Sequence, residues 1–243
     1  MTDQGAFGPA SEKTALLVNL GRMDYQAAWD VQQRIQERQI AGELGHVVLM
    51  VEHPPTITLG RRGKTDDLVA PASVLERRGI AVTETDRGGQ VTYHGPGQLV
   101  VYPQVNLQRL ELDLHAYMRA LEESVIVYLA TVGITGTRIK DFVGVWVTGE
   151  KVCAMGVRVR KWWTMHGLAL NVATDLNHFG MIVPCGIRNK GVTSLAKILG
   201  PDAPAFETVR CEFPAHLAKA LGLAVQAVDF QDFEKRIGAS GAL

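Results

Sequence analysis

The chain has 243 residues, 47% of them apolar, and its 25 basic residues balance its 25 acidic ones. This length suits one large domain, and the balanced charge argues against a nucleic-acid-binding protein that works through a broad basic surface. No apolar run approaches the length of a membrane span, and the N-terminus shows no hydrophobic segment of a signal peptide. The three cysteines lie too far apart for a CxxC metal or redox motif, and their odd number suits a reduced compartment. We therefore expect a soluble cytoplasmic protein without a metal.

Residues 1–13 are polar and predict a flexible tail, residues 14–230 predict a single domain, and residues 231–243 predict a second tail. The first half of the domain alternates short apolar runs with amphipathic segments. Its pattern predicts strands at 14–20, 46–51, 56–60 and 80–85, and helices from Asp24 to near Gly42 and at 71–78.

The stretch from Arg87 to Pro103, RGGQVTYHGPGQLVVYP, is the densest in glycine. It predicts a strand at 90–93, a turn at His94 and a buried strand at 99–102 that stops at Pro103. Glycines let a ligand approach the backbone closely. The stretch matches neither a GxGxxG that opens a helix nor a phosphate-binding P-loop, so it indicates no nucleotide site.

The second half begins with a helix that Asp113 caps, and its buried stripe is expected to run from Leu114 to Val132. Strands are predicted at 143–147, 150–158 and 166–172, with a hairpin turn around Gly149. A helical turn at 175–179, helices at 192–199 and 206–221, and a strand at 225–230 complete the chain. This mixture without regular βαβ alternation predicts an α+β or mixed α/β domain.

Three cysteines are candidates for chemistry. Cys153 and Cys211 lie in regular elements, so core packing is the favoured interpretation for both. Cys185 lies between Pro184 and Gly186, where a tight loop exposes a thiol beside backbone amides, as a nucleophile requires. A thiolate also needs a partner. The candidates are His94, His166, His178 and Lys151, whereas His53 is interpreted as a loop residue.

Five motifs occur in order between Arg87 and Leu195: RGGQVTYHGPGQLVVYP, GEKVCAMGVRV, HGLALNV, PCGI and GVTSL. Together they resemble the octanoyl-[acyl-carrier-protein]–protein octanoyltransferases, also called lipoate-protein ligases B. The resemblance implies the catalytic-domain fold of biotin- and lipoate-protein ligases, a mixed β-sheet flanked by helices. It also implies Cys185 as nucleophile and Lys151 as its partner. The substrate-binding residues that it implies are Arg87, Gly88, Gly89, Gln90, Val91, Thr92, Tyr93, His94, Ala154, Met155, Gly156, Gly167, Leu168 and Ala169.

The small residues of that set would leave room for an alkyl chain, and Met155 and Leu168 would give it apolar walls. The implied reaction moves octanoyl from the phosphopantetheine arm of acyl carrier protein, through a thioester on Cys185, to a lysine of a lipoyl domain. The implied acceptors are E2 subunits of 2-oxoacid dehydrogenases and the glycine cleavage H protein. This is the first step of protein lipoylation, and the resemblance implies no cofactor, nucleic acid or membrane partner.

Two alternatives remain open at this point. An ATP-dependent lipoate or biotin ligase on the same fold needs no cysteine, and the PCG motif speaks against it. A non-catalytic acyl-binding module would use the same apolar pocket with an inert Cys185. Separately, Lys161-Trp162-Trp163 predicts partly buried tryptophans beside a basic edge with Arg158 and Arg160, which could steer an acidic carrier protein.

Overall fold

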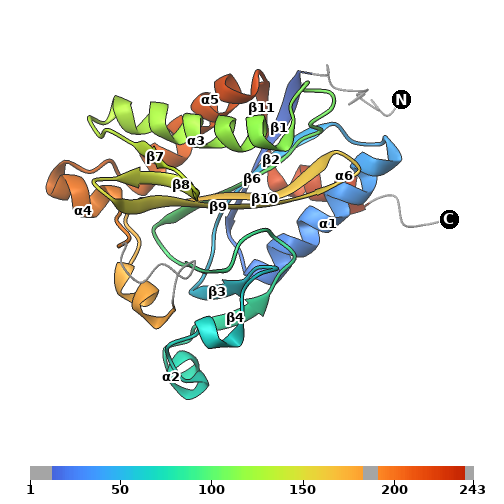
Figure 1. Ribbon diagram of the computed structural model, residues 1–243. Coiled ribbons are helices and arrows are strands. Elements are labelled where there is room, and N and C mark those ends of the chain that lie inside the picture. The colour runs from blue at the N-terminus through green and yellow to red at the C-terminus, as the bar shows by residue number, and fades with distance from the viewer. Residues whose placement is uncertain (1–12, 183–190, 239–243) are drawn as a thin grey trace.

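Figure 1 shows the computed structural model, which describes residues 13–182 and 191–238. An eight-stranded sheet runs through its centre in the strand order β11-β1-β2-β6-β10-β9-β8-β7. β1 lies parallel to β11 and β2, and every other neighbouring pair in this sheet is antiparallel. In chain order the strands are β1 (Thr14–Arg22), β2 (His46–Glu52), β6 (Gln98–Gln104), β7 (Thr137–Ile139), β8 (Phe142–Val147), β9 (Glu150–Arg160), β10 (Trp163–Asn171) and β11 (Ala224–Val228).

A second, three-stranded sheet lies below the main one in Figure 1. It places β3 (Thr56–Leu59) between β4 (Ala81–Glu84) and β5 (Val91–His94). Its apolar side chains form a small core with those of α2 (Ala72–Arg77) and the 3-10 helix η2 (Leu176–Met181). The predicted class, a mixed sheet flanked by helices, is confirmed, and the structure adds this smaller sheet.

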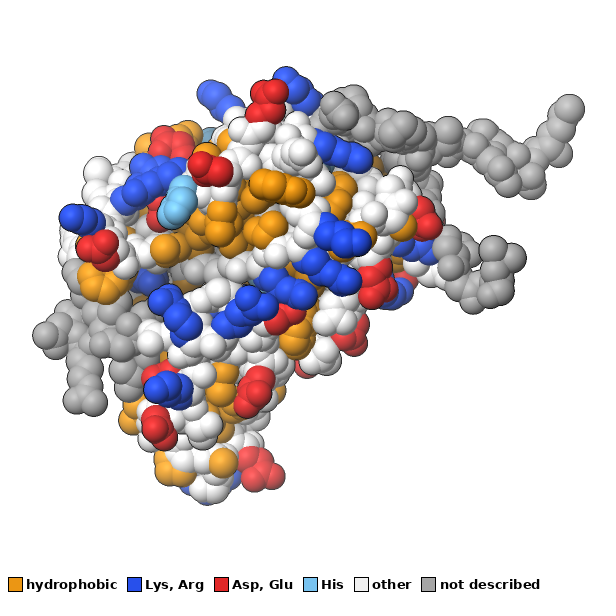
Figure 2. All heavy atoms as spheres, turned by 45° about the vertical axis from the view of Figure 1, so that its right-hand side comes forward, with side chains coloured by type: hydrophobic (Ala, Val, Ile, Leu, Met, Phe, Trp, Pro, Cys, Tyr) orange, Lys and Arg blue, Asp and Glu red, His pale blue; other side chains and the backbone are white. Residues whose placement is uncertain are grey.

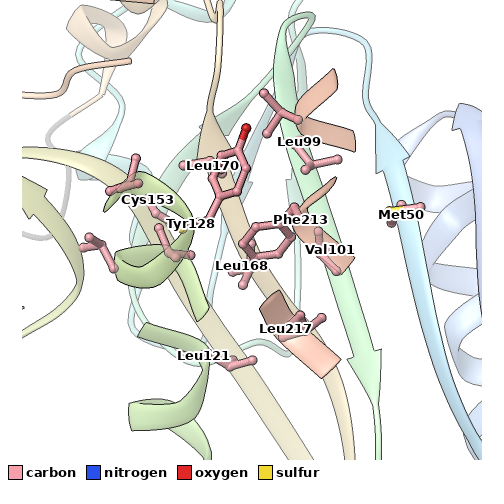
Figure 3. Close-up of a cluster of buried hydrophobic side chains, with 14 of the residues drawn as sticks. Met50, Leu99, Val101, Leu121, Tyr128, Cys153, Leu168, Leu170, Phe213 and Leu217 are labelled. Atoms are coloured by element: carbon pink, nitrogen blue, oxygen red, sulfur yellow. The ribbon is translucent and has the colours of Figure 1, made fainter. Parts of the chain in front are cut away.

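Helices cover both faces of the main sheet (Figure 1). α3 (Leu114–Thr131) and α5 (Phe206–Leu221) pack on one face, and α1 (Tyr25–Ala41) and α6 (Phe230–Gly238) pack on the other. Figure 3 shows the first core, where Tyr128 of α3 meets Phe213 of α5 edge to face with 5.9 Å between the ring centroids. Shorter helical segments are η1 (Thr65–Asp67), α4 (Leu195–Leu199) and η4 (Gly200–Asp202).

Local sequence explains where the long helices begin and end. Asp24 caps α1 by accepting hydrogen bonds from two backbone N–H groups of its first turn. Gly42 ends α1 at φ 82°, a left-handed conformation that glycine adopts without steric cost. Asp113 caps α3 by accepting from the N–H of Ala116. The predictions for these helices, and the predicted limits of α5, are confirmed.

The prediction that Pro103 stops its strand is wrong, because Pro103 pairs with Val48 inside β6. β10 pairs with β6 only over residues 98–101, so Pro103 lies where the strand has β2 as its only registered neighbour. Proline, which lacks an N–H, is tolerated at such a place. The prediction that Leu114 belongs to the buried stripe of this helix is also wrong, because Leu114 is exposed at the start of α3.

The predicted tail from residue 231 is wrong as far as Gly238, because the chain forms α6 there. Phe233 and Ile237 of α6 are buried in the core on the α1 face. The spacing of Phe230, Phe233 and Ile237 is the helical signal that could have revealed it. The predicted N-terminal tail falls on residues 1–12, outside the described residues, apart from Lys13.

The two cysteines predicted to be core residues differ in the structure. Cys153 is fully buried in the core under α3, and burial raises the pKa of its thiol. Cys211 is exposed on α5, so the prediction of core packing is wrong for it. Among the helices of the described ranges, none combines the length and apolar character needed to cross a membrane.

Candidate active site

A pocket opens where the start of α1 and the strand β5 of the smaller sheet meet β6, β9 and β10. Lys151 lines it together with most of the predicted substrate-binding residues. Those residues are Arg87, Gly89, Gln90, Val91, Thr92, His94, Ala154, Met155, Gly156, Gly167, Leu168 and Ala169.

Two predicted residues, Gly88 and Tyr93, are not part of this lining. Tyr93 packs instead in the small core, where its hydroxyl lies 2.7 Å from Nδ1 of His178. Cys185 lies outside the described residues. Sequence patterns carried no sign of five further lining residues, because only the folded sheets bring them together: Tyr25, Val100, Tyr102, Phe179 and Val192.

Arg87 places a buried guanidinium in the pocket wall. Its Nε and Nη2 donate to Oγ1 of Thr58 at 3.1 and 2.8 Å, and Nη2 also donates to the Thr58 carbonyl at 2.7 Å. Its Nη1 donates to the carbonyl of Gly88 at 3.1 Å. These bonds hold the cation in one orientation, as binding of a polar or anionic substrate group requires.

Two pocket glycines are required by backbone packing. A Cβ on Gly156 would lie 2.5 Å from the carbonyl oxygen of Gly88, which crosses β9 at this point. A Cβ on Gly167 would lie 2.2 Å from the carbonyl oxygen of Val101 in β6. From the sequence, we interpret the small residues here as leaving room for an alkyl chain. At these two positions, backbone packing is a second reason for glycine. Close approach of neighbouring backbones demands glycine there regardless of any ligand.

A chain of amide hydrogen bonds ties the pocket strands together. His94 Nδ1 lies 2.8 Å from Gln98 Oε1, and Gln98 Nε2 donates to Asn171 Oδ1 at 2.9 Å. Asn171 Nδ2 in turn donates to the carbonyl of Thr193 at 3.0 Å. Because the Gln98 oxygen can only accept, His94 carries its proton on Nδ1, and its Nε2 is left as an acceptor near Thr58.

Three histidines around the pocket are held in the neutral form. Burial lowers the pKa of His53 to about 4 and lowers that of His94 well below its usual value. His53 is the loop residue that the sequence predicted, and its Nδ1 donates to the carbonyl of Met23 while its Nε2 accepts from the Tyr102 hydroxyl. Burial also lowers the pKa of His166, against the opposing effect of Asp86. Apart from these histidines, the basic side chains of the described pocket lining are Arg87 and Lys151.

His166 occupies an unusual place in β10, with φ 58° in the middle of a strand. A left-handed conformation at a bulky residue persists only where its surroundings hold it. Its backbone N–H donates to Gln32 Oε1 at 2.9 Å, and its Nε2 lies 2.7 Å from Asp86 Oδ1. Arg158 donates to the second oxygen of Asp86 at 2.5 Å. Burial opposes ionisation of Asp86, but the His166 hydrogen bond and nearby cations leave its pKa lowered.

Lys151 lines the pocket, and its backbone is hydrogen-bonded to the segment that directly follows residues 183–190. Its N–H donates to the carbonyl of Gly191, and its carbonyl accepts from the N–H of Thr193, both at 2.9 Å. Phe179 and Val192, one on each side of residues 183–190, both line the pocket. Described residues on both sides of residues 183–190 therefore contribute to the pocket wall.

The hairpin between β9 and β10 carries the predicted basic edge. Lys161 and Trp162 form its two-residue turn, with φ 48° and 69°. The expected partial burial holds for Trp163, which is buried under the guanidinium of Arg109, whereas Trp162 is 52% exposed. Figure 2 shows Lys and Arg side chains gathered in a row on the side of the molecule toward which this hairpin points.

Sequence comparison identifies close relatives over most of the chain. Residues 24–218 match the family described as the lipoyl protein ligase A/B catalytic domain. The chain is 49% identical to an octanoyltransferase of Chloroflexus aggregans over 80% of its own length and 90% of the relative. It is 44% identical to an octanoyltransferase of Solibacter usitatus over 94% and 98% of the two chains. The resemblance found in the motifs is confirmed.

Structural comparison finds the same fold at much lower identity. A putative lipoate protein ligase from T. acidophilum with bound lipoic acid superposes with a TM-score of 0.71 at 14% identity, covering 93% of each chain. A biotin protein ligase from Aquifex aeolicus superposes with a TM-score of 0.53 at 16% identity, over 85% of this chain and 70% of the ligase. These similarities show the shared fold. The family match over residues 24–218 and the identity with octanoyltransferases establish that the chain belongs to the lipoyl protein ligase A/B catalytic-domain family.

Proposed function

We propose that this protein is an octanoyltransferase of protein lipoylation. It moves an octanoyl group from acyl carrier protein to the ε-amine of a lysine on a lipoyl domain. The observation that carries the proposal is the joint position of Lys151 and the Gly-rich residues around one pocket, in a chain 40–49% identical to octanoyltransferases.

The first half of the proposed reaction forms an acyl-enzyme. The thiolate of Cys185 attacks the thioester carbonyl of the octanoyl group, and the carbon–sulfur bond to phosphopantetheine breaks. The released thiolate takes up a proton from the Lys151 ammonium, which leaves Lys151 neutral for the second half. Support comes from Phe179 and Val192, which lead into residues 183–190 from the pocket wall. Apolar Leu168 and Met155 suit the alkyl chain, and Arg87 suits a polar group of the carrier arm.

In the second half, the neutral amine of the acceptor lysine attacks the carbonyl of the acyl-enzyme. The Cys185 thiolate leaves, the amide forms, and the surplus amine proton must be accepted. We assign the acceptor role to Lys151, because the nearby histidines are engaged in hydrogen bonds and Lys151 lines the pocket. Conversion of a thioester to an amide is downhill, so the reaction needs no nucleotide.

The proposed donor is octanoyl-acyl carrier protein, and the proposed acceptors are lipoyl domains of 2-oxoacid dehydrogenase E2 subunits and the glycine cleavage H protein. The basic side chains near the β9–β10 hairpin would steer an acidic donor toward the pocket. We place this reaction in the cytoplasm, which agrees with the odd number of cysteines.

The test is intact mass spectrometry after mixing the protein with octanoyl-acyl carrier protein without ATP or magnesium. We expect a gain of one octanoyl group, mapped to Cys185, and its transfer to an added lipoyl domain. Activity only with ATP and free octanoate would favour a ligase instead. An inert protein that binds octanoate without either reaction would favour an acyl-binding module.

A further inference from the structure

The side chain of Lys151 points to a different face of β9 from the one that simple alternation would assign. Successive side chains of a strand point to opposite faces, so Lys151 would belong with Cys153, Met155 and Val157. Those three pack in or against the core under α3. Lys151 instead lines the pocket, as do Ala154, Met155 and Gly156. Because Met155 also packs against the core, the lining alone does not assign the face of Lys151, and the pairing with β8 decides it.

A β-bulge produces this switch. Val145 of β8 pairs with Cys153, but the next residue, Trp146, pairs with Lys151, so Val152 is an extra residue in β9. A bulge re-aims the side chains beyond it. Both Val152 and Cys153 therefore face the core, and Lys151 moves to the pocket side.

Gly144 and Glu122 secure the bulge from the β8 side. Gly144 has φ 121°, and a Cβ on it would lie 2.5 Å from the Cys153 carbonyl oxygen and 3.5 Å from Cε of Lys151. Its N–H donates to Oε1 of Glu122, a buried carboxylate of α3, at 3.2 Å. Arg138 and Arg119 both donate to the other oxygen of Glu122, so that this carboxylate is a fixed part of the framework.

The bulge places Lys151 opposite Trp146 on one face of the β8–β9 pair. The Nζ of Lys151 lies 4.7 Å from the centroid of the Trp146 ring. Trp146 is 1% exposed, and its Nε1 donates to the Phe142 carbonyl at 3.2 Å, which fixes the plane of the ring. Val145 and Val147 on either side of it belong to the core under α3, so the indole lies on the opposite face.

We propose that Trp146 is a positioning residue for Lys151, holding its amine as an ammonium against the indole face inside the pocket. A cation over a buried indole is attracted by the negative face of the ring, and tryptophan is the strongest aromatic partner. The proposal deepens the proposed function, on which its catalytic relevance rests, because an ammonium held there supplies the positive charge that a thiolate needs.

Other titratable and charged groups lie on the elements around Lys151 and must stay constant in a test. On its own strand lie Cys153 and Glu150, the latter paired with Lys197 of α4 at 2.9 Å. On α3 lies Glu122, which accepts a hydrogen bond from the N–H of Gly144. The remaining titratable or charged groups of the described pocket wall are Tyr25, Arg87, His94, Tyr102 and His166.

The experiment replaces Trp146 by a series of increasingly fluorinated tryptophans, which change the charge of the ring face with little change of shape. Weaker attraction to the ring destabilises the ammonium form of Lys151, so at a fixed pH more of the amine is unprotonated. We expect the rate of Lys151 labelling by a neutral acylating reagent, read by peptide mass spectrometry, to rise about fivefold across the series.

The matched control is the same series at Trp163, whose buried ring faces Arg109 instead of Lys151. Labelling of Lys151 should not change there. A flat labelling rate in the Trp146 series, or an equal trend in both series, would overturn the proposal and leave Trp146 as a packing residue. Octanoyl transfer is measured separately. If no octanoyl transfer occurs but Lys151 labelling still rises across the Trp146 series, the proposed function is wrong and the role of Trp146 in holding Lys151 is upheld.

Discussion

The two faces of the main sheet are built from the same strands but differ in chemistry. On the α3 and α5 face, Leu170, Cys153 and Phe213 belong to a core of apolar side chains (Figure 3). On the opposite face, the same part of the sheet buries His94, His166 and other polar groups around the pocket. His94 and His166 are each held there by a specific partner, Gln98 and Asp86, since burial without partners is costly. The difference indicates that one face supplies stability and the other is shaped for chemistry.

The largest expected effect is on the apolar face. Phe213→Ala should lower the free energy of unfolding by about 4 kcal/mol, because it leaves a cavity beneath Tyr128. Urea unfolding followed by circular dichroism measures this loss. The residual folded protein should keep the Lys151 labelling rate of the wild type. If the folded Phe213→Ala protein also lost Lys151 labelling, the proposed division between the two faces would be contradicted.

On the pocket face, Lys151→Ala should slow octanoyl transfer by roughly 100-fold or more if Lys151 is a general base, with little change in unfolding. Lys151→Arg keeps the charge but does not titrate in the working range, so it should not restore turnover. Single-turnover assays of acylation and transfer separate these variants. Wild-type rates in Lys151→Ala would leave His94 or His166 as the candidate base.

The polar face should also make stability depend on pH. His53 has a pKa of about 4 in the folded protein against 6.5 in the unfolded chain, so the unfolded state binds more protons between these values. Stability is therefore full above pH 6.5 and falls as pH drops toward 4. Between pH 7 and pH 5 the loss from His53 is about 2 kcal/mol.

His53→Gln keeps a donor for Met23 and an acceptor for Tyr102 but does not titrate. Its unfolding free energy should change with pH by about 2 kcal/mol less than that of the wild type over this range. Phe213→Ala should keep the wild-type pH dependence, because it touches only the apolar face. Identical slopes for His53→Gln and wild type would show that His53 titrates normally in the folded protein.

The smallest expected effect lies on the surface. Exchanging Arg160 and Lys161 for serine should raise KM for the carrier protein about threefold at low salt, with kcat unchanged. The effect should vanish at high salt, because exposed charges are screened. Lys219→Ser, an exposed basic change on α5, serves as the control. If the change in KM did not depend on salt, or if Lys219→Ser changed KM equally, the hairpin would not be part of the docking surface for the carrier protein.

Local sequence determined most of the elements, because their signals act over a few residues. Asp24 and Gly42 bound α1, Asp113 starts α3, and the motif order between Arg87 and Leu195 indicated the family. The glycines of the predicted binding residues were recognisable in the same way. The reasons for Gly156 and Gly167, however, lie in the carbonyl groups of Gly88 and Val101 on other strands.

Tertiary structure alone decided which side chains meet in the pocket. Strand alternation places Lys151 with the core, and only the pairing of β8 with β9 creates the bulge that turns it to the pocket. The left-handed His166 is likewise held by Gln32 and Asp86, which are 134 and 80 residues away along the chain. Capping and periodicity are local and can be recognised in a sequence. Register, bulges and strained backbone depend on contacts between distant segments, which no single stretch of sequence contains.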